Sequence, residues 1–227
     1  FPGTAARGLT FQANPVTGDR RISGSAAALV GLDVARQSGD TRDMGAALGR
    51  IFLGHALVAG FGGVPVIWSG DEIGMPNDPT WASEPGHEDD NRWVHRPRLD
   101  WDAAQHRADL RTVEGRVFQG LAHLARVRAH LPQLHASVSS EVLPLWDDGV
   151  LALARRHPEG TMLCIYNVTD SWRHVPGWVL RDHGLGSCLE ALSGEWVTPG
   201  PDDRVGLPPY AVAWFVAHLH ESWAEDE

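Results

Sequence analysis

Lysine is absent from the 227-residue sequence, so all nineteen basic residues are arginines. Without lysine the chain cannot form a lysine Schiff base or supply the lysine of a phosphate-binding loop. Cysteine is scarce too, because only Cys164 and Cys188 are present. Two cysteines are too few for a disulfide framework or a thiolate metal site, and both lie in apolar, strand-like runs. We therefore expect buried free thiols.

Long apolar runs and an excess of positive charge are also missing. No run reaches the roughly 18 uncharged apolar residues of a membrane span, and the opening FPGTAARG lacks the apolar block of a signal peptide, so we expect a cytoplasmic protein. The formal charge of −10 and the pI near 5.6 argue against a nucleic-acid partner. The chain opens at Phe1 rather than methionine, and we expect that a preceding part has been removed.

The first half of the sequence alternates loops with apolar segments. Residues 1–25 are rich in turn-forming residues and predict a long loop or part of an inserted subdomain. Residues 25–32 favour a short helix, and the apolar spacing in residues 41–60 predicts a longer one. Glycines then precede a short apolar run, Val64 to Trp68, that we interpret as a buried strand. The loop over residues 73–100 is long enough that we expect it to be functional.

The second half changes character after one more helix. Apolar residues form a single stripe over residues 110–131, which predicts a helix that Pro132 ends. From Val142 onward, short β-rich runs separated by Gly, Asp and Pro predict a small antiparallel sandwich. The runs are VLPLW, GVLALARR, TMLCIYNV, HVPGWVL, CLEAL, EWVT and YAVAWFVAHL. We place the domains at residues 1–135 and 136–227.

Two clusters of acidic residues could be interpreted as catalytic groups or as metal ligands. Asp71 and Glu72 are neighbours, and adjacent residues of a strand point to opposite faces, so they cannot flank one glycosidic bond together and we favour a loop-anchoring role. The segment from His87 to Asp90, with His95, has the spacing of no known zinc or calcium loop. It is open to two interpretations: a solvated acidic loop paired with nearby arginines, or part of a sugar-binding loop.

Ten tryptophans are many for a chain of this length, and tryptophan faces stack on sugar rings. The alternative is that most of them are core residues. We expect burial for those after residue 140, because they lie in strand-like runs.

Three segments resemble a known family. ARGLTFQANPVTGDRRISGSAAALVGL (residues 6–32) and DDNRWVHRPRLDW (residues 89–101) resemble segments of amylosucrases and the related sucrose hydrolases. GGVPVIWSGDEIGMPND (residues 62–78) resembles a motif shared across the α-amylase superfamily. The resemblance implies the C-terminal portion of a (β/α)8 TIM barrel: part of an inserted subdomain (residues 1–32), helix 7, strand 8 and helix 8. An antiparallel β-sandwich domain follows.

The resemblance also implies an activity. Such enzymes cleave sucrose by a retaining mechanism, release fructose and transfer glucose to an α-glucan acceptor, with no cofactor and no metal. The catalytic aspartate, glutamic acid and supporting aspartate should lie upstream of Phe1, so the chain alone should be inactive. Two alternatives remain open: a sucrose hydrolase of the same subgroup, and a non-catalytic carbohydrate-binding remnant.

Two arginines match binding positions of that family. Arg21 corresponds to an arginine on the fructosyl or acceptor side of the scissile bond, with Arg20 as its competitor in the motif. Arg92 corresponds to an arginine that pairs with an upstream aspartate to close the glucosyl pocket; the alternative is a surface ion pair. Weaker candidates for acceptor contacts are Gln12, Asn14 and Asp19, which can equally be turn residues that bond their own backbone.

Overall fold

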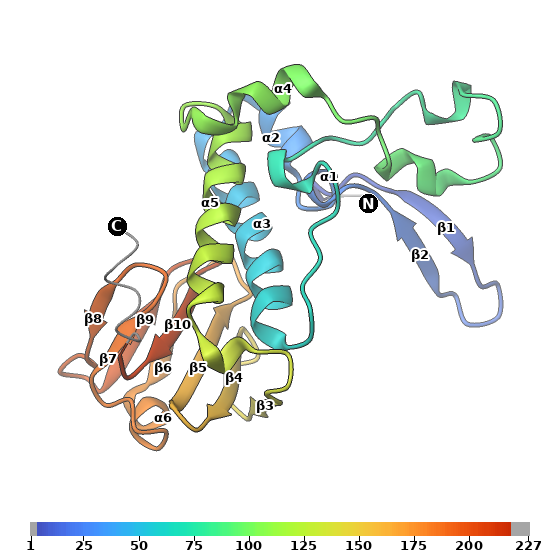
Figure 1. Ribbon diagram of the computed structural model, residues 1–227. Helices are drawn as coiled ribbons and strands as arrows, with labels where there is room; N and C mark the ends of the chain where they lie inside the picture. Colours follow the sequence, from blue (N-terminus) through green and yellow to red (C-terminus); the bar gives the residue numbers. More distant parts are fainter. Residues whose placement is uncertain (1–3, 219–227) are drawn as a thin grey trace. The chain divides into compact units, whose positions relative to one another are not determined.

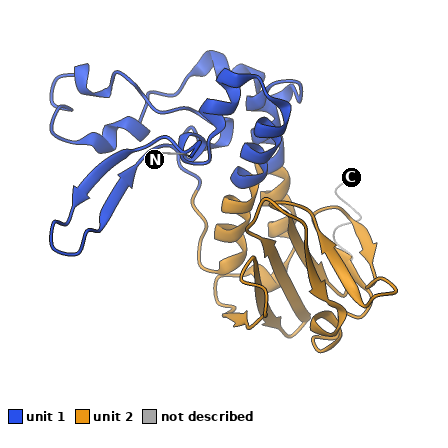
Figure 2. Cartoon of the chain, turned by 180° about the vertical axis from the view of Figure 1, so that it is seen from behind, with its two compact units in different colours: residues 1–51, 67–120 blue, residues 52–66, 121–227 orange. Residues whose placement is uncertain are grey.

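A computed structural model describes residues 4–218 of the chain. The chain divides into two compact units, coloured separately in Figure 2. Unit 1 comprises residues 1–51 and 67–120, and unit 2 comprises residues 52–66 and 121–227.

Unit 1 combines one β-hairpin with short helices and long loops (Figure 1). Its elements are β1 (Leu9–Ala13), β2 (Arg20–Ser23), α1 (Ala26–Leu29), α2 (Leu32–Ser38), the first part of α3 (Thr41–Phe61), η1 (Asp71–Ile73), η2 (Trp81–Ser83), η3 (Asn91–His95), α4 (Trp101–Gln105), η4 (His106–Ala108) and the first part of α5 (Val113–Ala129).

The structure confirms the two long helices. The helix expected over residues 25–32 is instead split into α1 and α2 by Gly31, which has a left-handed φ of 86°. A side chain at Gly31 would also meet Ala5, whose Cβ would lie 2.7 Å from the added Cβ. In α3 the apolar spacing holds, and the buried side includes Leu48, Ile51 and Ala56.

By length and composition alone, α3 is apolar enough to be a candidate membrane span, although the sequence has no long uncharged apolar run. The helix contains charged residues such as Arg50, whose side chain donates two hydrogen bonds to the carbonyl of Val30 at 2.9 and 2.7 Å. A core helix passes the same test of length and composition.

Two expectations in the first half were wrong. Of the two alternatives for residues 1–25, the long loop is wrong, because Leu9–Ala13 and Arg20–Ser23 form the antiparallel hairpin β1–β2. The predicted strand at Val64–Trp68 is not formed, and Val64 and Val66 are 80% and 73% exposed. A β-strand requires a partner for its backbone groups, and no described strand pairs with this segment.

Unit 2 contains an antiparallel six-stranded sheet in the order β3-β4-β5-β10-β7-β8 and a two-stranded ribbon, β6-β9. The antiparallel architecture confirms the prediction for this region. The elements are η5 (Pro132–Leu134), β3 (Ser140–Leu143), β4 (Val150–His157), β5 (Gly160–Asn167), β6 (Arg173–Pro176), α6 (Gly177–Arg181), β7 (Cys188–Glu190), β8 (Glu195–Val197), β9 (Arg204–Leu207) and β10 (Val212–Val216), together with the second parts of α3 and α5.

The central strands β4 and β5 are buried on both faces, as their burial patterns show. On one face, residues such as Ile165 and Phe215 pack with Val175 of the ribbon and Leu180 of α6 in one apolar cluster. On the other face, the Tyr166 hydroxyl donates to the Ala56 carbonyl of α3 at 3.2 Å. Gly60 is required there, because a Cβ would overlap the same hydroxyl oxygen.

Arg155 is fully buried on the α3 side of the sheet. Its guanidinium donates to the carbonyl oxygens of Phe61 (3.0 Å), Gln133 (2.7 Å) and His135 (2.9 Å), among other acceptors. Burial lowers the pKa of Arg155 from its ordinary value. The C-terminal carbonyls of a helix carry partial negative charge and lack helical partners, so the arginine caps the end of α3.

Several details of the second half differ from expectation. The run HVPGWVL is a strand only in its first part, since residues 177–181 form α6, and β9 was not predicted. The run YAVAWFVAHL forms β10 over Val212–Val216, and its last residue, Leu219, lies outside the described part of the chain. Cys164 and Cys188 are free and buried as expected, and burial raises their pKa values to about 12 and about 11.

The expectation of buried tryptophans was also wrong. Among those after residue 140, Trp214 is fully buried, whereas Trp146, Trp172, Trp178 and Trp196 are exposed. Trp223 lies outside the described residues. The exposed tryptophans lie at positions that do not face the core. Trp146 lies in the turn before β4, and Trp172 directly precedes β6. Trp178 lies in α6, and Trp196 lies in β8 at the edge of the sheet.

Candidate functional site

The hairpin β1–β2 presents the first of the predicted binding arginines. Arg21 lies directly opposite Phe11 in the strand register. Directly opposed residues share a face of the hairpin, so the two side chains project on the same side. Arg20 is adjacent to Arg21 and lies opposite Ala13, which places it on the other face.

Arg92 approaches Phe11 from the long loop. Its guanidinium carbon lies 5.4 Å from the centroid of the Phe11 ring, a cation–π distance. The same guanidinium binds both carboxylate oxygens of Asp90: Nε donates to Oδ1 at 2.7 Å and Nη2 to Oδ2 at 2.6 Å. This pairing lowers the pKa of Asp90 to about 2. Arg92 therefore lies over the ring of Phe11, a residue that the sequence did not single out, and Arg21 lies on the same face of the hairpin as that ring.

Two asparagines hold the loop on the hairpin segment. The Asn91 amide donates to the Thr10 carbonyl at 2.6 Å, and its oxygen accepts from the Ser23 hydroxyl at 3.3 Å. The Asn77 amide donates to the Arg7 carbonyl at 3.2 Å, and its oxygen accepts from the backbone N–H of Ser25 at 2.8 Å. Each amide uses both its donor and its acceptor side. Their partners lie far away in sequence, so no local pattern indicated them.

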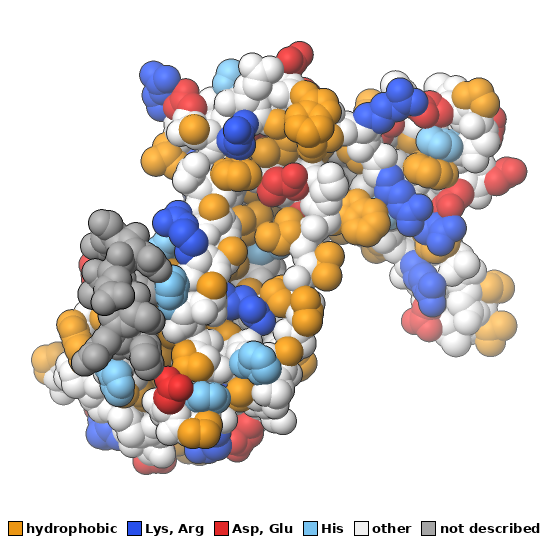
Figure 3. Space-filling view, in the orientation of Figure 1, with side chains coloured by type: hydrophobic (Ala, Val, Ile, Leu, Met, Phe, Trp, Pro, Cys, Tyr) orange, Lys and Arg blue, Asp and Glu red, His pale blue; other side chains and the backbone are white. Residues whose placement is uncertain are grey.

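A stack of aromatic and cationic side chains extends along the loop. The rings of His87 and Trp93 are parallel within 6°, with centroids 3.8 Å apart. The Arg96 guanidinium lies over Trp93 at 5.5 Å and over Trp68 at 5.9 Å. Burial, followed by the positive charge of Arg96, lowers the pKa of His95 from its ordinary value. Figure 3 shows cationic side chains gathered over the hairpin and this loop.

The weaker candidates from the hairpin have different surroundings. The Asn14 side-chain oxygen accepts from the backbone N–H of Val16 at 2.9 Å, and Asp19 accepts from the Thr17 hydroxyl at 2.6 Å. Both side chains therefore engage the turn between the strands. Gln12 sits at a register shift with a left-handed φ of 51°. Such bulges re-aim a side chain, and strained non-glycine residues gather at functional sites.

Glu72 takes the anchoring role proposed for the carboxylate pair. Its Oε2 accepts from the backbone N–H of Gly70 at 2.6 Å, which closes the turn before η1. Within residues 4–218, no group of three or more His, Cys, Asp or Glu side chains is arranged to hold a metal ion.

Comparisons with known proteins found one family model and several solved structures that this chain resembles. Residues 140–216 match the family model described as the amylosucrase C-terminal domain. Similar solved structures include AmyP in complex with maltose, at a TM-score of 0.63 and 14% identity over 85% of this chain and 38% of that one. Another is the protein Ttha1563 from Thermus thermophilus, at a TM-score of 0.56 and 22% identity over 87% of this chain and 34% of that one.

A third is the α-amylase from Geobacillus thermoleovorans complexed with acarbose, at a TM-score of 0.52 and 20% identity over 83% of this chain and 36% of that one. The chain therefore spans between 34% and 38% of the length of these structures. The family model matches residues 140–216, and the structural likeness at 14% to 22% identity shows a shared fold.

Proposed function

We propose that this chain is the C-terminal part of an amylosucrase-like retaining glucosyltransferase. The parent enzyme cleaves sucrose, releases fructose and transfers glucose to an α-1,4-glucan. The observation that carries the proposal is that Arg92 lies over the Phe11 ring and that Arg21 shares the hairpin face of that ring. Both arginines lie in the two segments that resemble amylosucrases, and residues 140–216 match the C-terminal domain of that family.

The proposal includes an architecture for the parent protein. Residues 1–135 contribute the last portion of a (β/α)8 barrel, and residues 136–227 form the C-terminal β-domain. In a complete barrel, Val64–Trp68 would be the eighth strand. Its exposed apolar side chains support this assignment, because pairing with neighbouring barrel strands would bury them.

The chemistry assigns binding roles to this chain and bond cleavage to the rest of the parent protein. There, an aspartate attacks the glucosyl carbon and a glutamic acid protonates the departing fructose. Arg21 offers its planar set of donors to hydroxyls on the fructosyl or acceptor side. Arg92 closes the glucosyl pocket by sharing its guanidinium between Asp90 and an aspartate of the parent barrel. The sugar ligands of the structural neighbours, maltose in AmyP and acarbose in the Geobacillus enzyme, are consistent with a glucan acceptor.

Product analysis tests the proposal. The full-length protein is incubated with sucrose, and fructose, free glucose and insoluble glucan are followed together. Fructose in excess of glucose, with glucan appearing, is the expected result. Equal amounts of fructose and glucose without polymer would make the parent a sucrose hydrolase, and no release of either sugar would refute the sucrose assignment.

Replacing Arg92 tests the role of the cluster in the same assay. We expect Arg92→Ala to lose most sucrose cleavage, because the glucosyl pocket would open. Arg98→Ala is the matched control, since Arg98 lies on the same loop and its side chain is 90% exposed. Near-normal kinetics of the Arg92 variant would reduce Arg92 to a surface ion pair.

A further inference from the structure

A pocket beside the ribbon β6–β9 gathers cationic side chains in a chain whose formal charge is −10. It has a volume of about 310 Å³ and is lined by Asp147, Trp172, Arg173, His174, Pro176 and Arg204. We refer to it as the ribbon pocket. All of these residues belong to unit 2. Two guanidinium groups and an imidazole therefore share the lining of this pocket with a single carboxylate.

The strand register explains why a hollow forms here. Val175 lies in the core, so its neighbour His174 points to the outer face of the ribbon by alternation. Gly206 lies directly opposite His174 and has no side chain, and Arg204 lies on the same face two positions before it. A Cβ at Gly206 would be 3.4 Å from the Cζ3 atom of Trp172. The glycine therefore leaves room between an indole ring and two side chains that carry hydrogen-bond donors.

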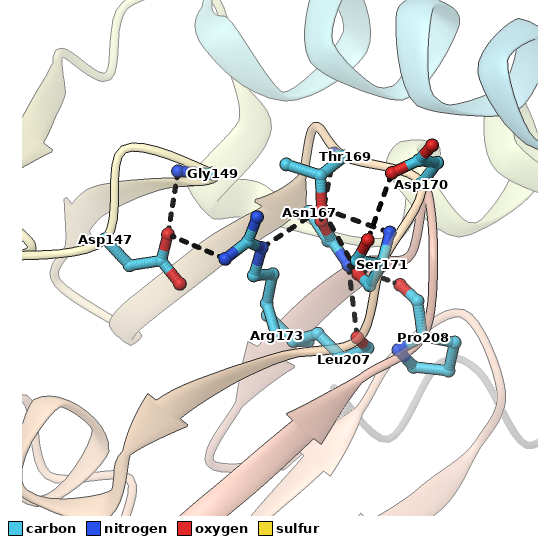
Figure 4. Close-up of polar contacts among 9 residues, drawn as sticks. All are labelled: Asp147, Gly149, Asn167, Thr169, Asp170, Ser171, Arg173, Leu207 and Pro208. Carbon is cyan, nitrogen blue, oxygen red and sulfur yellow. Dashed lines mark hydrogen bonds and ion pairs between the residues drawn. The ribbon is translucent and has the colours of Figure 1, made fainter.

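The turn before β6 is held by a buried amide (Figure 4). Asn167 donates to the carbonyl oxygens of Ser171 (2.8 Å), Leu207 (3.1 Å) and Pro208 (2.7 Å). Its own oxygen accepts from the backbone N–H and the hydroxyl of Thr169. These bonds tie the turn before β6 to the end of β9, so the pocket is built before any ligand arrives.

The carboxylate of the pocket is largely engaged within the protein. The Oδ1 atom of Asp147 accepts from the Gly149 backbone N–H at 2.8 Å and lies 3.7 Å from Nη1 of Arg173 (Figure 4). The Nε atom of Arg173 donates to the Thr169 hydroxyl at 3.1 Å. Arg173 therefore offsets the charge of Asp147, and one oxygen of that carboxylate is left as an acceptor.

The other two cationic side chains are uncommitted. Neither Arg204 nor His174 has a side-chain hydrogen bond or an ion pair within the described part of the chain. Asp203 directly precedes Arg204, but both of its carboxylate oxygens are bound by Arg181. Arg204 therefore faces the pocket without a counter-ion. An arginine in this situation is best satisfied by an anion, because a guanidinium binds charged oxygens with two parallel hydrogen bonds.

We propose that the ribbon pocket binds a small phosphate monoester that carries sugar hydroxyls, namely a hexose phosphate or a mononucleotide. The phosphoryl oxygens accept hydrogen bonds from Arg204 and His174. The ring of the ligand packs on Trp172, which is 63% exposed, and the free oxygen of Asp147 accepts from a ligand hydroxyl. The volume lies at the lower end of the range for ligand pockets, which suits one ring and its phosphate.

Each part of the pocket excludes a simpler ligand. A neutral sugar lacks the charge that Arg204 requires, and inorganic phosphate lacks the ring and hydroxyls that Trp172 and Asp147 would contact. We therefore expect organic phosphates to bind more tightly than either. The inference rests on the ribbon pocket alone and does not depend on which sugar the parent protein cleaves.

Calorimetry with the full-length protein tests this inference, with glucose 6-phosphate, AMP, inorganic phosphate and glucose as probes. We expect Arg204→Gln to weaken binding of the organic phosphate about tenfold or more, because hydrogen bonds between charged groups are lost. Trp172→Ala should weaken it about fivefold and leave inorganic phosphate unchanged. Arg156→Gln is the matched control, since Arg156 is an exposed arginine of unit 2 outside the pocket. Thermal unfolding verifies that the variants fold.

A further variant distinguishes an anion site from a site for neutral sugars. Asp147→Asn keeps an oxygen for the Gly149 N–H but removes the negative charge from the pocket. The affinity for inorganic phosphate should therefore rise, because the cations of the pocket are no longer offset. An unchanged or lower affinity for phosphate in this variant would contradict the inference.

The wild-type and variant data together decide the matter. Loss of organic phosphate binding in the Arg204 and Trp172 variants, with the Arg156 variant unchanged, supports the inference. The comparison of glucose 6-phosphate with AMP then shows whether the ligand is a sugar phosphate or a nucleotide. Absence of binding, equal binding by wild type and the Arg204 variant, or glucose or inorganic phosphate binding as tightly as the organic phosphates overturns it. Whether the protein cleaves sucrose bears on the proposed function alone.

Discussion

Arginine serves several distinct purposes in this chain, which has no lysine to share them. The Arg92 guanidinium binds Asp90 with two nitrogens and lies over Phe11. The Arg155 guanidinium instead collects backbone carbonyls inside unit 2. Both uses depend on a planar group with donors in fixed directions, which an ammonium group does not provide. The cationic residues near the candidate site are therefore suited to orient a hydroxyl or a carboxylate.

The Asp90–Arg92 pair makes a prediction about titration. The pKa of Asp90 is lowered from 3.8 to about 2 chiefly by its hydrogen bonds to Arg92. Arg92→Ala should return the pKa toward 3.8, as NMR titration of the Asp90 carboxyl can measure. In the protein with Arg92 intact, the stabilising effect of the pair on the folded state is complete above pH 3.8 and is lost as the pH falls through about 2. An unchanged Asp90 pKa in the variant would contradict the pairing.

Sequence predicted some functional side chains and missed others for physical reasons. Arg21 and Arg92 lie within motifs, so they could be proposed by resemblance, but their roles stay predictions. Phe11, Asn77 and Asn91 became visible only in three dimensions, because their partners come from distant parts of unit 1. The exposed tryptophans were misplaced because a strand-like run does not reveal which of its residues face the core.

At the scale of elements, side chains of β4 and β5 donate hydrogen bonds to the C-terminal end of α3. Arg155 of β4 caps the helix, and Tyr166 of β5 donates to Ala56 across a contact that needs glycine at position 60. Both strands carry buried residues on each face, so their central position was readable from their apolar runs. The capping role of Arg155 could not be predicted from the sequence, because nothing in the sequence distinguishes a buried arginine from a surface arginine.

Removing this cap should destabilise unit 2. Arg155→Leu leaves several buried carbonyl groups without donors, and we expect a loss of about 3 kcal/mol in the free energy of unfolding. Arg156→Leu is the control at the next position, where the side chain is exposed and pairs with Glu141. Its effect should stay within about 0.5 kcal/mol. Urea denaturation of both variants compares them, and equal stabilities would argue against the cap.

The periodicity of apolar residues predicted α3, α5 and most strands of the sheet, and the structure agrees. It failed where the local pattern carries too little information. The hairpin β1–β2 is polar and exposed on most positions. The run HVPGWVL changes from strand to helix after Pro176, and a helix of five residues leaves no periodic signal.

At the scale of the whole molecule, the segment Val64–Trp68 stands out because it is apolar, exposed and unpaired among the described strands. Such a segment favours association between chains. We expect the isolated 227-residue chain to be inactive on sucrose and to aggregate, as light scattering after size-exclusion chromatography would show.

Substitution locates the cause of that aggregation. Val66→Ser should reduce it, whereas Val16→Ser should not, although Val16 is the more exposed of the two valines and lies alone in the hairpin turn. A soluble, monomeric preparation of the unaltered chain would show that the segment carries no such liability.

The central claim is that the Phe11 face of the hairpin belongs to a sugar site of the full-length protein, and one comparison tests it most directly. Arg21 lies on that face and its neighbour Arg20 on the other. The kcat/KM for sucrose should fall about tenfold or more in Arg21→Ala, because hydrogen bonds from a charged donor to the substrate are lost, and stay near the wild-type value in Arg20→Ala. Equal values for the two variants, or a larger loss from Arg20→Ala, would contradict the account.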